Sequence, residues 1–339
     1  MKINIGVLRG GISSEYDASL KTGGAVLSNL KEDKYRPVDI LITKDGEWHA
    51  DGMPIEKENL KSIVDVIWNG LHGKYGEDGQ VQSILDRIGV PYTGPNSLAA
   101  KTSLNKHLAK KNLSLDHYSD LNIRMPYGEV VEGIESSVWL GSLEDIENYI
   151  TESAKKVFNR IPPPWIVKPL CGGSSIDTYV ANNFDQLREV LEMVLKNHEE
   201  GAIVEEYVRG REIVLGVIED FRDKSHYSLL PLEIIKPREI FDHQTKSEAS
   251  YRLISPSDLS SNEKMALQEI GKRIHRKMGL RHYSMIDLII NKYATYVLEV
   301  DGLPCLGEGS IFRESMESIG INFQDFLDHV ITSTLQNSK

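Results

Sequence analysis

Short apolar runs alternate with amphipathic segments over the first hundred residues. The apolar runs cover residues 2–8, 37–43 and 64–68, and the amphipathic segments cover residues 18–30 and 81–88. The runs predict buried strands and the segments predict helices, so their order indicates a parallel sheet with helices on its faces. Ligands of such sheets bind beyond the carboxyl ends of the strands. The loops that follow the strands are therefore candidate parts of a site.

Two of these loops are rich in glycine. They cover residues 9–15, with the sequence RGGISSE, and residues 69–79, with the sequence NGLHGKYGEDG. Glycine adopts backbone angles that other residues rarely reach, and it lets a ligand approach the main chain closely. We therefore expect both loops to line a binding site.

The rest of the chain mixes strands and helices, with no internal repeat. We expect helices over residues 98–113, 143–158, 184–196, 261–279 and 323–335. We expect strands over residues 165–168 and 202–208, and more strands from residue 212 onward. A chain of 339 residues is long enough for two or three domains.

Composition excludes several classes of partner. The net charge of −11 argues against a general electrostatic attraction to nucleic acid. No run of 18 apolar residues predicts a membrane span, and the apolar run at the N-terminus is too short for a secretory signal. The two cysteines, Cys171 and Cys305, have no metal-ligand spacing and no motif-linked histidine. We expect no disulfide framework, no cysteine chemistry and a cytoplasmic location.

Three carboxylates lie in apolar runs near the C-terminus. They are Asp287 in SMIDL and Glu299 and Asp301 in LEVD. Glu299 and Asp301 are two residues apart, so both point to one face of a strand. Grouped carboxylates resist burial unless a cation neutralises them, and magnesium commonly binds such oxygens together with substrate phosphates. The alternative is a set of solvated acids on an exposed strand face, which the flanking apolar residues disfavour.

Two further segments suit a nucleotide. In the first, Lys168 precedes residues 172–175 (GGSS), whose backbone N–H groups and hydroxyls can cradle phosphate, although a flexible surface turn is the alternative. This is not a Walker loop, because the lysine comes before the glycines. In the second, residues 204–212 (VEEYVRGRE) end at Glu212, a carboxylate suited to ribose hydroxyls. An amphipathic strand with outward charges is the alternative there.

In this order, the motifs resemble those of the D-alanine–D-alanine ligase family of the ATP-grasp superfamily. The most specific run is HGKYGEDG at residues 72–79, which is followed by VPYTGP at residues 90–95. The resemblance extends from residue 3 to about residue 333. It implies an α/β plus α+β fold, in which a Rossmann-like parallel sheet precedes a two-lobed ATP-grasp fold. The implied domains are residues 1–100, a central lobe of residues 101–207, and a C-terminal lobe of residues 208–339 with the metal site and a lid.

The resemblance also implies a reaction. ATP phosphorylates the carboxylate of a first amino acid, and the amine of a second one attacks the acyl phosphate. The products are a dipeptide for cell-wall peptidoglycan, ADP and phosphate. The implied cofactors are ATP and Mg²⁺, with Mn²⁺ as a possible substitute, the partners are amino-acid substrates, and the assembly is a homodimer.

The resemblance assigns roles to individual residues. On the ATP side these are Lys106, Lys168, Ser174 and Ser175 for phosphates, Glu205, Tyr207 and Val208 for adenine, Glu212 for ribose, and Asp287, Glu299 and Asp301 for the metal. On the substrate side they are Glu15 for the first ammonium, His72 near the first carboxylate, Ser310 for the second carboxylate and Lys246 of the lid for the transferring phosphate. Glu15, Ser174, Lys246 and Ser310 form the implied catalytic set. Glu15 could instead cap the helix after it, and His72 could only pin its loop.

Several positions depart from the family pattern, mostly on the substrate side. Met285 replaces an arginine, Gly172 an acid, Cys305 a glycine and Asp301 an asparagine, while His243 and Ser247 stand where lid tyrosines are usual. The thioether of Met285 cannot donate the paired, positively charged hydrogen bonds of an arginine guanidinium. Loss of one hydrogen-bond donor to the transition state typically raises the barrier by roughly 3 kcal/mol. Arg252, Arg281 and Arg313 are candidate replacements. The departures keep open a sister ligase that joins other amino acids or a hydroxy acid, and a non-catalytic nucleotide-binding relative.

Overall fold

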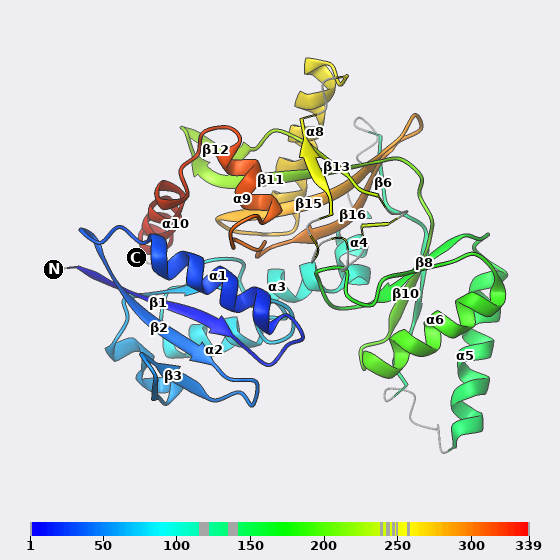
Figure 1. The fold of residues 1–339 in the computed structure, drawn as a ribbon, viewed down its shortest axis with the longest axis horizontal. Coiled ribbons are helices and arrows are strands. Elements are labelled where there is room, and N and C mark those ends of the chain that lie inside the picture. Colours follow the sequence, from blue (N-terminus) through cyan, green and yellow to red (C-terminus); the bar gives the residue numbers. More distant parts are fainter. Residues whose placement is uncertain are drawn as a thin grey trace.

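In the computed structural model, the described part of the chain forms three β-sheets (Figure 1). The structure describes residues 2–114, 122–134, 142–237, 240–241, 245, 248, 250–255 and 258–337. Among these residues, no helix combines the length and the apolar character needed to cross a membrane.

The first sheet has the strand order β4-β3-β2-β1-β5. Its strands are β1 (Ile3–Gly10), β2 (Tyr35–Ile42), β3 (Trp48–Ala50), β4 (Met53–Pro54) and β5 (Val66–Asn69). Strand β1 pairs in parallel with β2 and β5, which confirms the predicted parallel sheet, and β3 and β4 add an antiparallel edge. Helix α1 (Tyr16–Asn29) packs on one face, and α2 (Gln80–Ile88) and η1 (Lys57–Ser62) pack on the other. The two glycine-rich loops follow β1 and β5, at the carboxyl edge of the sheet.

The second sheet is antiparallel, with the order β7-β10-β8-β9. Its strands are β7 (Gly128–Val131), β8 (Trp165–Pro169), β9 (Tyr179–Ala181) and β10 (Ala202–Glu206). Helices α5 (Leu143–Phe158) and α6 (Phe184–Asn197) cover one face, where Trp165 and Val167 are buried. Because side chains alternate along a strand, Lys168 points to the opposite face, toward the third sheet.

The third sheet has the order β14-β13-β11-β15-β16-β6, with β12 paired to β11. Its strands are β6 (Ile123–Arg124), β11 (Arg211–Phe221), β12 (Lys224–Ser228), β13 (Leu232–Ile235), β14 (Arg252–Ile254), β15 (Tyr283–Ile290) and β16 (Thr295–Asp301). Helix α8 (Ser261–Lys277) packs on one face against Leu215 and Val217, and it begins with a capping box of Ser260 and Glu263. The other face is left for the site.

One predicted helix is wrong. The segment expected over residues 98–113 is two helices, α3 (Ser97–Leu104) and α4 (Lys106–Ser114). Asn105 breaks them because its backbone is extended and forms a bridge with Cys171. The break places Lys106 at the start of α4, facing the loop after β8.

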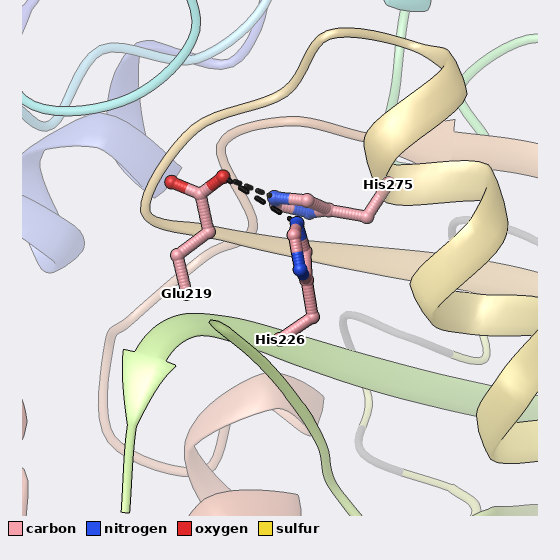
Figure 2. A group of neighbouring side chains, drawn as sticks. All are labelled: Glu219, His226 and His275. Atoms are coloured by element: carbon pink, nitrogen blue, oxygen red, sulfur yellow. Dashed lines mark ion pairs between the residues drawn. The ribbon is translucent and has the colours of Figure 1, made fainter. Parts of the chain in front are cut away.

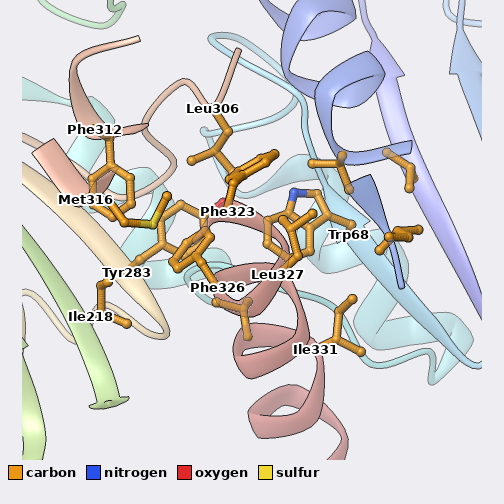
Figure 3. Close-up of a cluster of buried hydrophobic side chains, with 14 of the residues drawn as sticks. Trp68, Ile218, Tyr283, Leu306, Phe312, Met316, Phe323, Phe326, Leu327 and Ile331 are labelled. Carbon is orange, nitrogen blue, oxygen red and sulfur yellow. The ribbon is translucent and has the colours of Figure 1, made fainter. Parts of the chain in front are cut away.

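An aromatic core joins the first sheet to the third (Figure 3). It includes Trp68 of β5, Tyr283 of β15, Phe312 of α9 (Ile311–Glu317) and Phe326 of the closing helix α10 (Phe323–Asn337). The rings of Trp68 and Tyr283 stack with centroids 6.1 Å apart, and Tyr283 meets Phe326 edge-on at 5.3 Å. This packing holds the glycine-rich loops of the first sheet against the acid-bearing strands of the third.

Candidate active site

The acidic side chains gather on one face of the third sheet through strand register. Asp287 of β15 pairs with Glu299 of β16, and Met285 pairs with Asp301. Directly paired residues of antiparallel strands point to the same face. All four side chains therefore form one wall, which we call the acidic wall. The grouping expected from the sequence is confirmed.

The acidic wall separates two cavities. Asp287 and Glu299 line both of them, and Gly172 and Gly173 of the loop after β8 do the same. The smaller cavity, of about 120 Å³, lies between the second and third sheets. The larger one, of about 510 Å³, lies between the third sheet and the loops of the first. A group that spans both cavities must pass the carboxylates of Asp287 and Glu299.

Most of the predicted ATP residues line the smaller cavity, and the predicted substrate residues that the structure describes line the larger one. Those at the smaller cavity are Lys106, Lys168, Ser175, Glu205, Tyr207, Val208 and Glu212. Those at the larger cavity are Glu15, His72, Ser174, Asp301 and Ser310. Ser174 was expected on the ATP side, but it faces the larger cavity because its loop turns there with a positive φ of 52°.

Lys106 is buried between the acidic wall and the loop of residues 172–175 after β8, which we call the phosphate loop. Its Nζ donates hydrogen bonds to the carbonyl of Gly172 at 2.6 Å and to Oε1 of Glu299 at 3.1 Å. This contact brings one expected phosphate ligand next to one expected metal ligand, although 193 residues separate them in the chain.

Glu205 holds two lysines at the smaller cavity. It is 2% exposed, and its carboxylate accepts from Lys168 at 2.8 Å and from Lys110. Burial alone raises the pKa of Glu205, but the two lysines outweigh it and hold that pKa below its ordinary value. Lys110 was missed by the sequence analysis. The signal was available, because Lys106 and Lys110 are four residues apart and share a helix face.

The expected ribose ligand also has a cationic partner. Glu212 of β11, which lines the smaller cavity, forms an ion pair with Lys236, just beyond β13. Lys236 was not predicted, because no motif links it to Glu212.

The phosphate loop is tied to the first sheet. Ser174 Oγ donates a hydrogen bond to Oε2 of Glu15, the N-cap residue of α1. Among the described residues, the Glu15 side chain makes no helix-capping hydrogen bond, so the capping alternative is wrong. The carboxylate instead points into the larger cavity between two glycine-rich loops, and Oε1 lies near Gly73 and Gly173.

His72 connects three segments beside the larger cavity. Its Nδ1 lies 3.0 Å from Oε1 of Glu77, and its Nε2 lies 2.8 Å from Oγ1 of Thr22 and 3.4 Å from Sγ of Cys305. Burial alone lowers the pKa of His72, but Cys305 and Glu77 outweigh it and raise that pKa well above its usual value. His72 thus pins its loop to α1, as the alternative expected, and it also faces the cavity.

The contact between His72 and Cys305 was not anticipated, because 233 residues separate them. The contact places the Cys305 sulfur 3.4 Å from an imidazole nitrogen at the edge of the larger cavity. Cys305 is half-buried and lines the cavity, whereas burial raises the pKa of Cys171 and keeps its thiol protonated.

We expect iodoacetamide to alkylate Cys305 on the order of ten times faster than Cys171 at neutral pH, because Cys305 contacts an imidazole nitrogen whereas burial raises the pKa of Cys171. Peptide mass spectrometry over time measures both rates. His72→Gln should remove most of the difference, while His107→Gln, on an exposed helix position, should not. Equal rates at the two cysteines would contradict this prediction.

Acidic side chains far outnumber basic ones in the lining of the larger cavity. Burial and the nearby Glu77 raise the pKa of Asp301 well above its usual range, and burial raises the pKa of Glu77 to about 6. Lys21 of α1 is the one lysine or arginine that lines this cavity within the described part of the chain. The cavity therefore suits a ligand with an ammonium group or a bridging cation.

Ser310 offers an unused hydroxyl to the larger cavity. It is the N-cap residue of α9, yet its side chain makes no capping hydrogen bond. Its buried Oγ has no hydrogen-bond partner among the described residues. A buried hydroxyl without a partner costs free energy, so a polar ligand at this position would be stabilised.

None of the proposed replacements for the missing arginine lines the larger cavity. Arg281 donates to the carbonyl of Gly94 at 3.0 Å, and Arg313 binds Glu317 at 2.8 Å. Arg252 is exposed on β14. The expected lid residues His243, Lys246 and Ser247 lie outside the described residues.

The chain matches two family models over most of its length. Residues 133–332 match the family described as D-ala D-ala ligase C-terminus, and residues 4–59 and 51–95 match D-ala D-ala ligase N-terminus. A D-alanine–D-alanine ligase from Bacillus anthracis is 29% identical, over 99% of each chain.

Solved structures are similar over nearly the whole chain as well. The D-alanyl-alanine synthetase A of Vibrio cholerae has a TM-score of 0.80 and 25% identity, and the alignment covers 98% of each chain. The D-alanine–D-alanine ligase of Bacillus anthracis complexed with ATP has a TM-score of 0.74 and 26% identity, with 99% of this chain and 98% of that one covered.

The fold and the two adjoining cavities define an ATP-dependent ligase of the ATP-grasp type. The chain belongs to the D-alanine–D-alanine ligase family.

Proposed function

We propose that this ligase joins two molecules of D-alanine with ATP and Mg²⁺, and releases ADP and phosphate. The main observation in support is the acidic wall, in which Asp287 and Glu299 line both cavities at once. A phosphoryl group can therefore pass from a nucleotide in the smaller cavity to a carboxylate in the larger one without leaving the protein.

The smaller cavity supplies the groups that ATP needs. Lys106 and Lys168 would neutralise phosphate oxygens, together with the backbone of the loop at Ser174 and Ser175. Tyr207 and Val208 follow β10 and would line the adenine, and Glu212 would accept from ribose hydroxyls. Glu205 would act through Lys168, whose ammonium it holds in place.

The acidic wall fits a magnesium ion. Asp287, Glu299 and Asp301 present carboxylate oxygens on one sheet face, and burial raises the pKa of Asp301 in a way that a cation would reverse. Mg²⁺, or Mn²⁺ in its place, would neutralise charge on the transferring phosphate. Lys106, beside Glu299, would hold the same phosphate from the other side.

The larger cavity suits two small amino acids. Glu15 would bind the ammonium of the first, and His72 would lie near its carboxylate. The free hydroxyl of Ser310 would donate to the carboxylate of the second. We place Lys246 on the transferring phosphate when the lid closes, as the family pattern implies.

A screen of D- and L-amino acids for Mg²⁺-dependent ADP release tests this proposal. We expect release with D-alanine, together with the dipeptide detected by mass spectrometry. ADP release only with another amine or a hydroxy acid would show that D-alanine is not the substrate. ATP binding without turnover would show that the protein is not an active ligase.

Met285→Arg tests the substrate side of the same proposal. The new guanidinium would point into the larger cavity, beside Asp301, where Lys21 is the one described lysine or arginine. We expect kcat/KM for D-alanine to rise at least about tenfold. Removal of one oxyanion donor typically lowers kcat by roughly 10²–10³-fold, so a restored donor should recover part of that factor. Met285→Leu keeps the size without the charge and should match the natural protein. No difference between the two variants would show that Met285 does not limit the reaction.

We also propose a homodimer in the cytoplasm. The family resemblance supports the dimer, and light scattering after gel filtration measures it directly. Two free cysteines, which form no disulfide, support a reducing compartment.

A further inference from the structure

We propose a zinc-binding site on the face of the third sheet opposite to the acidic wall. Its ligands are Glu219 of β11, His226 of β12 and His275 of α8, whose side chains converge in Figure 2. Their potential ligand atoms all lie within 4.8 Å of one another. The site goes beyond the ligase reaction, because the cavities described above include none of these residues.

Secondary structure places the three side chains together. Glu219 and His226 are direct cross-strand partners in the β11–β12 hairpin, so they share a face. Helix α8 packs on that face and contributes His275, which is fully buried. The ligands thus come from three elements that the fold already holds in contact.

The distances fit a metal better than hydrogen bonds. His275 Nε2 lies 3.3 Å and His226 Nε2 lies 3.8 Å from Oε1 of Glu219. Both exceed the usual N–H···O range of about 2.7–3.2 Å. Two bonds of about 2.0–2.1 Å that meet at a tetrahedral zinc hold their ligand atoms about 3.3–3.4 Å apart. The two nitrogen–oxygen distances to Glu219 therefore lie within about half an ångström of the spacing that zinc ligands need.

The outer partners leave the ligand atoms available. His275 Nδ1 lies 2.7 Å from Oγ of Ser284, which orients the ring and turns Nε2 toward Glu219. That buried Nε2 makes no hydrogen bond to any described residue. Oε2 of Glu219 accepts from the backbone N–H of His282 at 2.6 Å, which leaves Oε1 for the cluster.

Ligand chemistry favours zinc over the magnesium of the reaction. Two imidazoles and one carboxylate are a known zinc set, with water as the fourth ligand, whereas Mg²⁺ prefers oxygen alone. Glu219 and His226 are each about one-fifth exposed, so an ion can enter from solvent. Bound zinc would cross-link the hairpin to α8.

Calorimetric titration of the metal-stripped full chain with Zn²⁺, in excess Mg²⁺, tests the site. We expect one equivalent to bind. Ser284→Ala removes the outer partner of His275 and should lower the Zn²⁺ affinity roughly 10- to 100-fold. Glu219→Gln and His226→Gln each remove a ligand and should lower the affinity by at least as much. His107→Gln, on the exposed side of α4, is the matched control and should bind like the natural protein.

Cobalt distinguishes this site from the thiol of Cys305. Co²⁺ in the proposed site should give the visible bands of a tetrahedral ion without a thiolate charge-transfer band, and His226→Gln should remove them. Circular dichroism shows whether each variant is folded, and Zn²⁺ should raise the Tm of the natural protein but not of His226→Gln. Absence of Zn²⁺ binding, or equal binding in all variants, would overturn the proposal.

Discussion

Glu299→Gln should lower Mg²⁺-dependent ADP release by on the order of 10³-fold, since electrostatic groups at the transferring phosphate carry most of the barrier reduction. Glu299 lies opposite Asp287 in the strand register and forms an ion pair with Lys106, so one substitution weakens both the metal site and the position of a phosphate ligand. Glutamine has nearly the same shape but carries no charge. Initial rates at saturating ATP, measured over a range of Mg²⁺ concentrations, test this prediction.

Glu192→Gln is a suitable control for Glu299→Gln. Glu192 lies on α6 and pairs with Lys196 at 2.6 Å, far from both cavities, so its loss should leave the rate unchanged. The loss of activity in Glu299→Gln should be accompanied by a shift of the Mg²⁺ requirement to higher concentration. If Glu299→Gln stays within about threefold of the natural rate, Glu299 does not hold the metal.

Glu205→Gln should destabilise the protein by roughly 3–5 kcal/mol, the usual cost of leaving a buried charge without its partner. Its carboxylate is 2% exposed and is the shared partner of Lys110 and Lys168. The substitution leaves two buried ammonium groups side by side, and burial already lowers the pKa of Lys110. Hydrogen exchange of the peptides covering β8 and β10, measured in increasing urea, reports the free energy of opening of this sheet.

Glu206→Gln is the matched control, since it lies next in the chain and is only half-buried. Its carboxylate accepts from the backbone N–H of Tyr127 at 2.9 Å, a bond that glutamine can still accept. We expect its free energy of opening to remain within about 0.5 kcal/mol of the natural protein, as for most surface changes. Equal losses in Glu205→Gln and Glu206→Gln would show that the two lysines do not depend on Glu205.

Local spacing made part of the site predictable. Glu299 and Asp301 share a face because side chains alternate along a strand, and this holds wherever the strand lies. The phosphate loop follows β8 directly, so its backbone was identified from glycines and serines alone. By contrast, the break at Asn105 was missed, because it depends on contacts with the distant residues Leu170 and Cys171.

Pairs that join distant segments were not readable in the sequence. Cys305 lies in the loop after β16 and His72 in the loop after β5, and Lys110 of α4 reaches Glu205 of β10. Each pair depends on how the sheets dock, and no short-range pattern encodes that geometry. The same holds for Glu219, His226 and His275, which meet only because a hairpin and a helix pack together.

By itself the sequence determined the strands β1, β2, β5, β8 and β10, most of the long helices, the acids that share a strand face and the family to which these motifs belong. These properties follow from hydrophobic periodicity, glycine positions and residue spacing, which act within a few residues of the chain. Only the tertiary structure decided that the acids form a wall between two cavities, that Ser174 faces the substrate side, and that a thiol lies against His72. Those outcomes depend on packing between sheets, where the aromatic core around Tyr283 sets which side chains meet.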